Sequence, residues 1–245
     1  MEKRNFSLVE LLVVIGIITL LAGLMIPAVM SSKTKGMVTQ AKADMTAIKM
    51  ALLGVERDYK TIFKASGGKF AFYRLKSSGG QSEEVSESVS GLPSGKKQLV
   101  LGGTDNKFSG KSVSNMVDGY YGMIAELSVP RDVTADKVNI NKRLIKYLDP
   151  RADYARGENA TMWQDPWGNP YVVMIDSDYD EKVYIPLQDD KVKKDDIKNK
   201  DGDCLVLSGK VFLYSLGPNG EDDGSFNADS VGGKSTTDDI RGWEK

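Results

Sequence analysis

The feature that most constrains this chain is an apolar segment near its N-terminus, residues 6–30, in which Glu10 is the sole charged residue. A helix of about 20 apolar residues is long enough to cross the hydrocarbon core of a bilayer. Lys3 and Arg4 directly precede the segment, and the positive-inside rule keeps such an N-terminus cytoplasmic. The segment therefore predicts a single-pass membrane helix, with the remainder of the chain exported.

Two other kinds of apolar N-terminus compete with this interpretation. A secretory signal peptide has an apolar core of roughly 7–15 residues followed by a small-residue cleavage site, whereas here the run is longer and the pattern beyond it continues as helix. The second competitor is an ordinary signal anchor, and length alone does not distinguish it from this segment. Glu10 argues against an ordinary anchor, because a carboxylate inside a membrane helix costs about 2.5–3.5 kcal/mol and usually has a partner there. The alternative is that Glu10 lies at headgroup depth.

Beyond Met30 the sequence turns polar but keeps a helical period. Apolar residues recur at alternating steps of three and four, which places them on one stripe of a helix; they are Val38, Ala41, Met45, Ile48, Leu52 and Val55. A fully exposed helix has no need of such a stripe, so it should pack on a sheet. We expect one long helix from about residue 6 to residue 59, with residues 31–59 as an amphipathic stem.

Composition excludes several classes of function. The chain has 245 residues, no histidine and one cysteine, Cys204. Catalysis by Ser-His-Asp or Cys-His groups and zinc sites with His ligands are thereby removed. Hydrophobic residues make up 40% of the chain and charged residues 27%, enough for a packed core, and the formal net charge of −1 gives no basis for a nucleic-acid partner.

The middle of the chain, residues 60–163, is less informative. Short strands are expected at 69–75 and 98–101, and helical spacing at 116–127 and 137–148. Residues 77–93 are rich in Ser, Gly and Glu and predict a surface loop. We take this part as a variable region that connects the stem helix to a sheet.

The C-terminal part, residues 164–245, carries the strongest β signals. Two prolines within residues 165–171 predict a compact turn, followed by a strand at 172–175. Residues 176–203 are dense in Asp and Lys. Asp176, Asp178 and Asp180 have the spacing that opens an EF-hand loop, but its glycine and closing glutamate are missing, which favours a solvated loop. Strands at 204–207 and 210–216 follow, around a turn at 208–209. The fold class expected is α+β.

At the N-terminus, residues 3–15 resemble the processing and methylation motif of type IV prepilins. The resemblance implies that residues 1–5 are a leader, that a prepilin peptidase cleaves between Asn5 and Phe6, and that the Phe6 amine is methylated. It also implies that Glu10 meets the Phe6 amine of a neighbouring subunit, which neutralises both charges in a low-dielectric filament core. Asn5 stands where the family has glycine.

The turn at residues 165–171 resembles a signature of the major pseudopilin of type II secretion, the G-type subunit. All its residues match: Asp165, Pro166, Trp167, Gly168, Asn169, Pro170 and Tyr171. The resemblance implies a structural role, in which Trp167 and Tyr171 cover the stem helix. Pro27 would let the apolar helix kink or locally unwind, and the overall fold implied is pilin-like, a long helix on a small antiparallel sheet.

Residues 215–224 and 237–243 resemble the calcium loop of pseudopilins. The ligands implied are the Leu216 carbonyl and the side chains of Asn219 and Asp238, with Asp222 and Asp239 as further candidates. Asn219 replaces the usual aspartate, and residues 226–235 look like an insertion between the two halves. The alternative is an acidic, glycine-rich tail that binds no metal and is held by Trp243.

These features predict a structural subunit rather than an enzyme. We expect a pseudopilin-like protein of the inner membrane that polymerises with its own copies for type II protein secretion. Prepilin peptidase, other pseudopilins and inner-membrane components of the secretion system are the expected partners, and calcium the expected cofactor. One alternative is a type IV pilus subunit or minor pilin for adhesion or DNA uptake. Another is a membrane-tethered hydrolase that uses carboxylates.

Overall fold

The computed structural model of the chain combines two helices with antiparallel sheets, which confirms the α+β class. It describes residues 8–60, 69–74, 81–86, 89–113, 116–128, 143, 145–149, 163–187, 200–222 and 239–243. The chain forms two compact units, residues 1–40 and residues 41–245. Each unit is described by itself.

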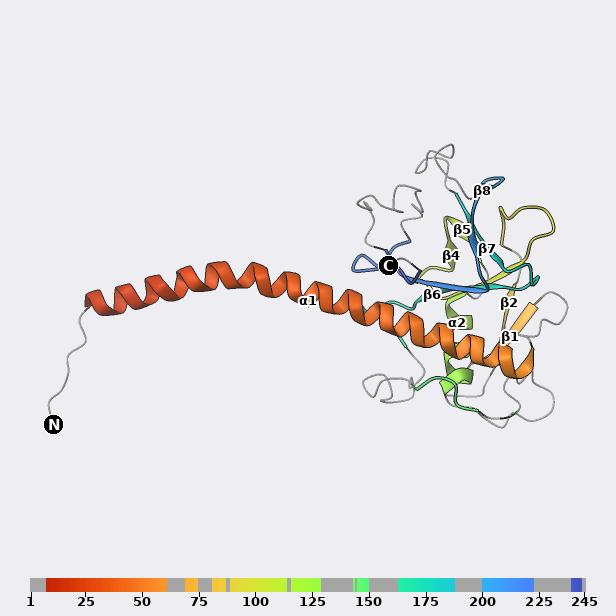
Figure 1. Cartoon of the computed structure of the whole chain (residues 1–245), viewed down its shortest axis with the longest axis horizontal. Coiled ribbons are helices and arrows are strands. Elements are labelled where there is room, and N and C mark those ends of the chain that lie inside the picture. Colours follow the sequence, from red (N-terminus) through yellow and green to blue (C-terminus); the bar gives the residue numbers. More distant parts are fainter. Residues whose placement is uncertain are drawn as a thin grey trace. The chain divides into compact units, whose positions relative to one another are not determined.

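Figure 1 shows the elements coloured in chain order and labels most of them. The helices are α1 (Leu8–Tyr59) and α2 (Met116–Ser128). The strands are β1 (Lys69–Arg74), β2 (Gln81–Ser86), β3 (Gln98–Leu101), β4 (Lys107–Phe108), β5 (Lys111–Ser112), β6 (Val172–Asp176), β7 (Lys182–Pro186), β8 (Lys200–Asp201), β9 (Cys204–Ser208), β10 (Val211–Ser215) and β11 (Ile240–Arg241).

The long N-terminal helix is present, and α1 runs for 52 residues. Wherever side chains are described between residues 8 and 36, they are exposed. Thr19 does not add an unsatisfied hydroxyl to this apolar surface, because its Oγ1 donates to the carbonyls of Ile15 at 2.9 Å and Gly16 at 3.0 Å. Among the described residues, no helix has the length and apolarity that crossing a membrane requires.

The second unit begins within α1, and here the helix is buried along one stripe. Ala41, Met45, Ile48, Leu52 and Val55 are each at most 1% exposed. These are residues of the predicted stripe, and the prediction of an amphipathic stem that packs on the globular part is confirmed for them. Burial of such a stripe, rather than helix propensity, supplies most of the stability of a helix in a protein.

The main sheet has the strand order β11-β10-β6-β3, with every pair antiparallel. Both central strands are buried along their whole length, so both faces of the sheet are covered. Val172 and Met174 of β6 belong to the core cluster on one face, together with Val183 and Ile185 of β7. Since side chains alternate along a strand, Tyr171 points to the opposite face, where it reaches α1.

A second sheet, β7-β9-β8, is joined to the first by a side chain. Gln98, at the start of β3, is completely buried. Its amide donates to the Tyr184 carbonyl at 2.7 Å and accepts from the Tyr184 N–H at 2.8 Å. The Gln98 amide therefore fills the place of a neighbouring strand at that point of β7.

Two expectations about the C-terminal part need correction. Residues 176–203 are not simply a solvated loop, because β7 lies within them and is largely buried. The strands on either side of Ser208 and Gly209 do form, but they do not pair with each other. Strand β9 pairs with β7, whereas β10 pairs with β6. The turn at residues 208–209 therefore connects two sheets, which the local pattern does not reveal.

The middle region also departs from the expected pattern. The strands at 69–74 and 98–101 and the helix at 116–127 are confirmed. Residues 81–86, expected as loop, form β2 because antiparallel pairing with β1 supplies their backbone hydrogen bonds. The helix expected at 137–148 is wrong for the residues described there, since 145–148 are not helical. Tyr147 and Leu148 instead donate backbone N–H groups to the Leu127 carbonyl at 2.9 and 3.0 Å.

Candidate functional site

The turn at residues 165–171 is organised around the buried carboxylate of Asp165. Its Oδ1 accepts the backbone N–H groups of Trp167 at 3.0 Å and Asn169 at 2.8 Å. Its Oδ2 accepts the hydroxyl of Ser215, at the end of β10, at 2.6 Å. Burial raises the pKa of Asp165 above its ordinary value, and the hydrogen bonds partly oppose that rise. The carboxylate thus shapes the turn and ties it to the sheet.

Tyr171 joins this turn to α1. Its hydroxyl donates to Asp44 Oδ2 at 3.0 Å, and both side chains are buried. Burial and the neighbouring Asp44 charge raise the pKa of Tyr171 far above its usual range, so the hydroxyl remains a donor. Tyr171 therefore contacts the stem helix as predicted. Trp167 is half-buried, and no contact of its ring with α1 is established.

Gly102 allows the backbone after Tyr171 to pass close to β3. Its φ of +95° lies in the region that favours glycine, and a Cβ built there would lie 1.7 Å from the Tyr171 carbonyl oxygen. No side chain fits that space. Glycine at position 102 is therefore a steric requirement for the turn to lie this close to the end of β3.

The predicted calcium ligands lie next to the same turn. Asn169 Nδ2 donates to the Gly217 carbonyl at 2.9 Å, directly after Leu216. Asn219 Oδ1 accepts the Glu221 N–H at 2.8 Å. Asp238 lies outside the described residues. The structure therefore places part of the predicted ligand set on the loop that follows β10.

Two of the additional ligand candidates carry charges that act on the buried hydroxyl of Tyr214. Burial raises the pKa of Tyr214 well above its ordinary value, and the charges of Asp222, Asp239 and Asp105 raise it further. Asp222 Oδ2 also accepts the Ser109 N–H at 2.7 Å. Carboxylates from three separate segments thus act on one buried hydroxyl, and carboxylate oxygens are ligands that hard cations prefer. Among the described residues, the three carboxylates that lie close enough together to share an ion are those of Asp176, Asp178 and Asp180.

Sequence reasoning missed Asp105. It lies between β3 and β4, more than a hundred positions before the other two carboxylates, and no local motif marks it. The same β3–β4 connection reaches the loop after β10 at a second point, where Thr104 Oγ1 donates to the Gly220 carbonyl at 3.0 Å. Only the antiparallel order of β3, β6 and β10 brings these segments together.

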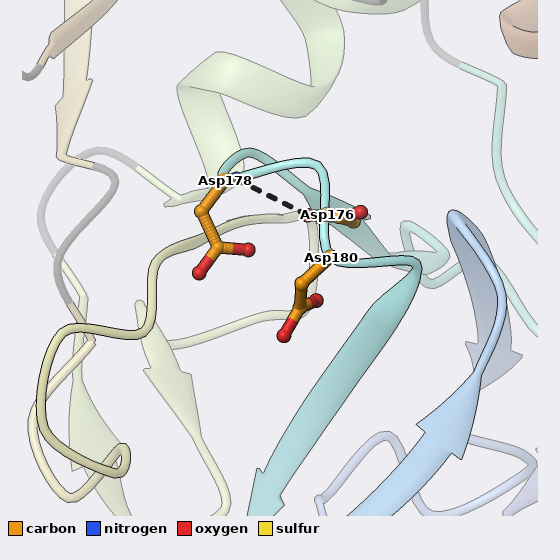
Figure 2. Close-up of side chains that lie close together, drawn as sticks. All are labelled: Asp176, Asp178 and Asp180. Carbon is orange, nitrogen blue, oxygen red and sulfur yellow. Dashed lines mark hydrogen bonds between the residues drawn. The ribbon is translucent and has the colours of Figure 1, made fainter.

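Asp176, the last residue of β6, forms a cluster with Asp178 and Asp180, and the ligand oxygens lie within 4.8 Å of one another (Figure 2). Asp176 shapes the turn, because its oxygens accept the N–H groups of Tyr179 and Glu181, both at 2.8 Å. Burial raises its pKa above the ordinary value. Asp180 Oδ2 lies 2.5 Å from Lys96 Nζ.

This cluster already contains a cation from the protein. The Lys96 ammonium lies 5.7 Å from the Tyr184 ring centroid, and Tyr184 donates its hydroxyl to Asp180 at 2.8 Å. The hydrogen bond to Asp180 raises the pKa of Lys96 above its usual value. Lys96 was not singled out in the sequence, because it is 84 positions away from Asp180.

The remaining predicted site residues lie at the two ends of the chain. Glu10 is exposed in the first turn of α1, while Asn5 and Phe6 lie outside the described residues. Helix α1 continues through position 27, so Pro27 does not end it. Trp243 packs edge-on against Phe212, with ring centroids 5.7 Å apart, consistent with a role in holding the C-terminal segment.

Comparison with known proteins adds no relative. No family model, no curated protein and no solved structure matches the chain. The function proposed below therefore rests on the residues of this chain and on the motifs they resemble.

Proposed function

We propose that the chain is a structural, pilin-like subunit that polymerises into an inner-membrane-based filament for type II protein secretion. The observation that carries the proposal is the exposed apolar surface of α1 between residues 8 and 30. Its large apolar side chains are typically half or more exposed, from 47% for Val14 to 77% for Leu8. An apolar surface of this extent marks contact with a membrane or with another protein.

The energetics support burial against lipid or sister helices. Burying one such side chain contributes roughly 1.5–3 kcal/mol, and the surface covers all sides of the helix rather than one stripe. A partner that contacts a single face would leave much of it in water. Lipid around an inserted helix, or several helices in a bundle, would cover it completely. We propose that the helix is anchored in the membrane before assembly and is bundled in the filament.

Glu10 gives this assembly its register. A carboxylate within an apolar helix is costly, and the amine of a neighbour's processed Phe6 would neutralise it. Opposite charges attract more strongly in a low-dielectric environment than in water. The pairing would therefore favour one stagger between adjacent helices over others.

The test is replacement of Glu10 in the native host, with filaments measured by shearing and microscopy. Glu10→Ala should abolish filaments while membrane insertion is kept, because removing the charge lowers the cost of insertion. Glu181→Ala changes an exposed glutamate of the globular unit, 72% exposed at its side chain, and should leave filaments unchanged. Normal filaments with Glu10→Ala would sink the assembly mechanism.

We further propose that calcium binds at the loop after β10, with Asp222, Asp239, the Leu216 carbonyl, Asn219 and Asp238 as its ligands. A bound cation would offset the repulsion between the carboxylates and fix the loop after β10. A ligand that binds only the folded state raises its stability. The melting temperature of the full chain should therefore rise with calcium and fall with chelator, and Asp239→Asn should remove that response. Equal melting temperatures in calcium and chelator would exclude the metal.

A pilus subunit for adhesion or DNA uptake is the nearest alternative. The turn at residues 165–171, which ties β10 to the stem helix through Asp165 and Tyr171, is the feature that favours the secretion subunit. Deletion of the gene distinguishes the two functions. Loss of exported proteins with normal adhesion and DNA uptake supports secretion, and the reverse result would support the pilus.

A further inference from the structure

Charge is distributed unevenly along the first unit of the chain. After Glu10 the sequence has no acidic residue until Asp44. Lys33 and Lys35, here called the lysine pair, follow the apolar surface almost immediately, and both side chains are exposed. Among the described residues neither lysine has an ion pair. The apolar part of α1 thus ends in a region that is purely cationic.

The spacing of these charges matches the dimensions of a bilayer. At about 1.5 Å per residue, the helix places Lys33 about 34 Å beyond Glu10 along its axis. The hydrocarbon core is about 30 Å thick, and the headgroup regions extend it to about 40–45 Å. If Glu10 lies near one edge of the core, the lysine pair lies at the headgroups of the opposite surface.

The two lysines do not form a patch on one face. Successive residues of an α-helix are about 100° apart, so Lys33 and Lys35 project about 200° apart, on opposite sides. A single docked protein surface would contact one of them. A layer of phosphates that surrounds the helix would contact both, and long lysine side chains can reach such a layer from slightly different depths.

We propose that the lysine pair binds the phosphate groups of anionic phospholipids where α1 leaves the membrane on its exported side. This inference rests on the proposed membrane anchoring. The contact sets the depth of the helix before assembly, because moving the subunit in either direction separates the ammonium groups from the phosphate layer. The partner is the lipid headgroup, and a sister subunit is the alternative that the test addresses.

The experiment compares partitioning of the purified full chain into vesicles of phosphatidylcholine with and without phosphatidylglycerol, in buffer free of inorganic phosphate. Each lysine near an anionic surface is worth about fivefold in affinity. Lys33→Gln combined with Lys35→Gln should therefore reduce the preference for anionic vesicles about 25-fold. Salt should weaken the wild-type preference more than that of the variant.

The matched control changes two lysines of the globular unit. Lys107→Gln with Lys146→Gln alters the net charge equally, and these side chains are 57% and 54% exposed. The control should keep the full preference for anionic vesicles. An unchanged preference in the Lys33 and Lys35 variant, or an equal loss in the control, would overturn the proposal. So would a Lys33 and Lys35 variant that fails to self-assemble in lipid-free detergent, because the pair would then bind a sister subunit.

The outcomes separate this inference from the proposed function. Failure of the wild-type chain to enter phosphatidylcholine vesicles would refute membrane anchoring itself. Normal entry without an effect of the lysine pair would refute only the headgroup contact. The filament test at Glu10 is independent of both results.

Discussion

Helix α1 contains two regions with opposite relations to the solvent. Between residues 8 and 30 its large apolar side chains are exposed, whereas Ala41 to Val55 present a buried stripe. The first region is apolar on all sides of the helix. In the second region apolar residues recur only at steps of three and four, so they lie on one side. The comparison shows that the spacing of apolar residues along a helix determines what can cover its apolar surface. A stripe is covered by the chain's own sheet, while an apolar surface on all sides needs something outside the chain.

The largest expected effect separates a glycine of the globular unit, Gly102 after β3, from Gly16 in the exposed region of α1. Gly102→Ala should lower the free energy of unfolding by more than about 4 kcal/mol, because strain at a positive φ adds to a clash with the Tyr171 carbonyl. Gly16→Ala meets nothing within 4 Å and should change it by less than about 0.5 kcal/mol. Urea unfolding of the full chain in detergent measures both. Comparable losses would contradict the comparison.

Truncation of an apolar side chain should give the next largest difference. Leu52 is fully buried, whereas Ile18 is 58% exposed. Leu52→Ala should cost about 2–4 kcal/mol, since it removes transfer energy and leaves a cavity, and Ile18→Ala less than about 0.5 kcal/mol. The same unfolding measurement applies. An equal cost at Ile18 would show that the globular unit depends on the first region for its stability.

A smaller loss is expected where the buried region of α1 meets the turn at residues 165–171. Tyr171→Phe removes one donor from the buried Asp44 carboxylate and should cost about 1–3 kcal/mol. Tyr179→Phe, at a side chain that is 55% exposed, is the control and should be nearly neutral. A neutral Tyr171→Phe would mean that the contact does not hold the helix to the turn.

The smallest effect should appear in the dependence of stability on pH. Burial raises the pKa of Asp165 above its ordinary 3.8, so the folded state binds this proton more tightly than the unfolded state. Stability from this group is therefore present below pH 3.8 and is lost as pH rises through the folded pKa. Asp165→Asn should remove that loss, so the difference in unfolding free energy between the two proteins should change with pH over this interval. A constant difference would contradict the shift.

Local patterns predicted much of this fold. The end of α1 at Tyr59, the buried stripe, β3, α2 and the strands after residues 171, 203 and 210 were all readable from periodicity and turn residues. Strand β2 was missed because its Ser- and Glu-rich sequence has weak β propensity and depends on pairing with β1. The assignment of β9 and β10 to different sheets was missed because tertiary pairing overrides local signals.

The candidate sites were less predictable for a related reason. Asn219 and Asp222 belong to a continuous motif, and the sequence identified them. Asp105 and Lys96 come from the β3–β4 connection and the segment before β3, far from the acidic residues they approach. Interactions between such distant segments are set by strand order, which the sequence does not display directly. Asp178 and Asp180 lie in the turn after β6, in agreement with the loop interpretation, whereas Asp176 is the buried last residue of β6. The lysine partner of Asp180 was not foreseen.

The Gln98 amide bears on how a subunit of the proposed filament would avoid aggregation through its strands. An open strand edge is a template on which another molecule's strand can add, and such growth leads to aggregates. If the chain assembles as proposed, its subunits would be concentrated and would meet each other's strand edges often. By occupying both backbone groups of Tyr184, one internal side chain closes that position of β7 to a foreign strand. In the proposed filament, contacts between subunits would then come from the helices rather than from paired strands.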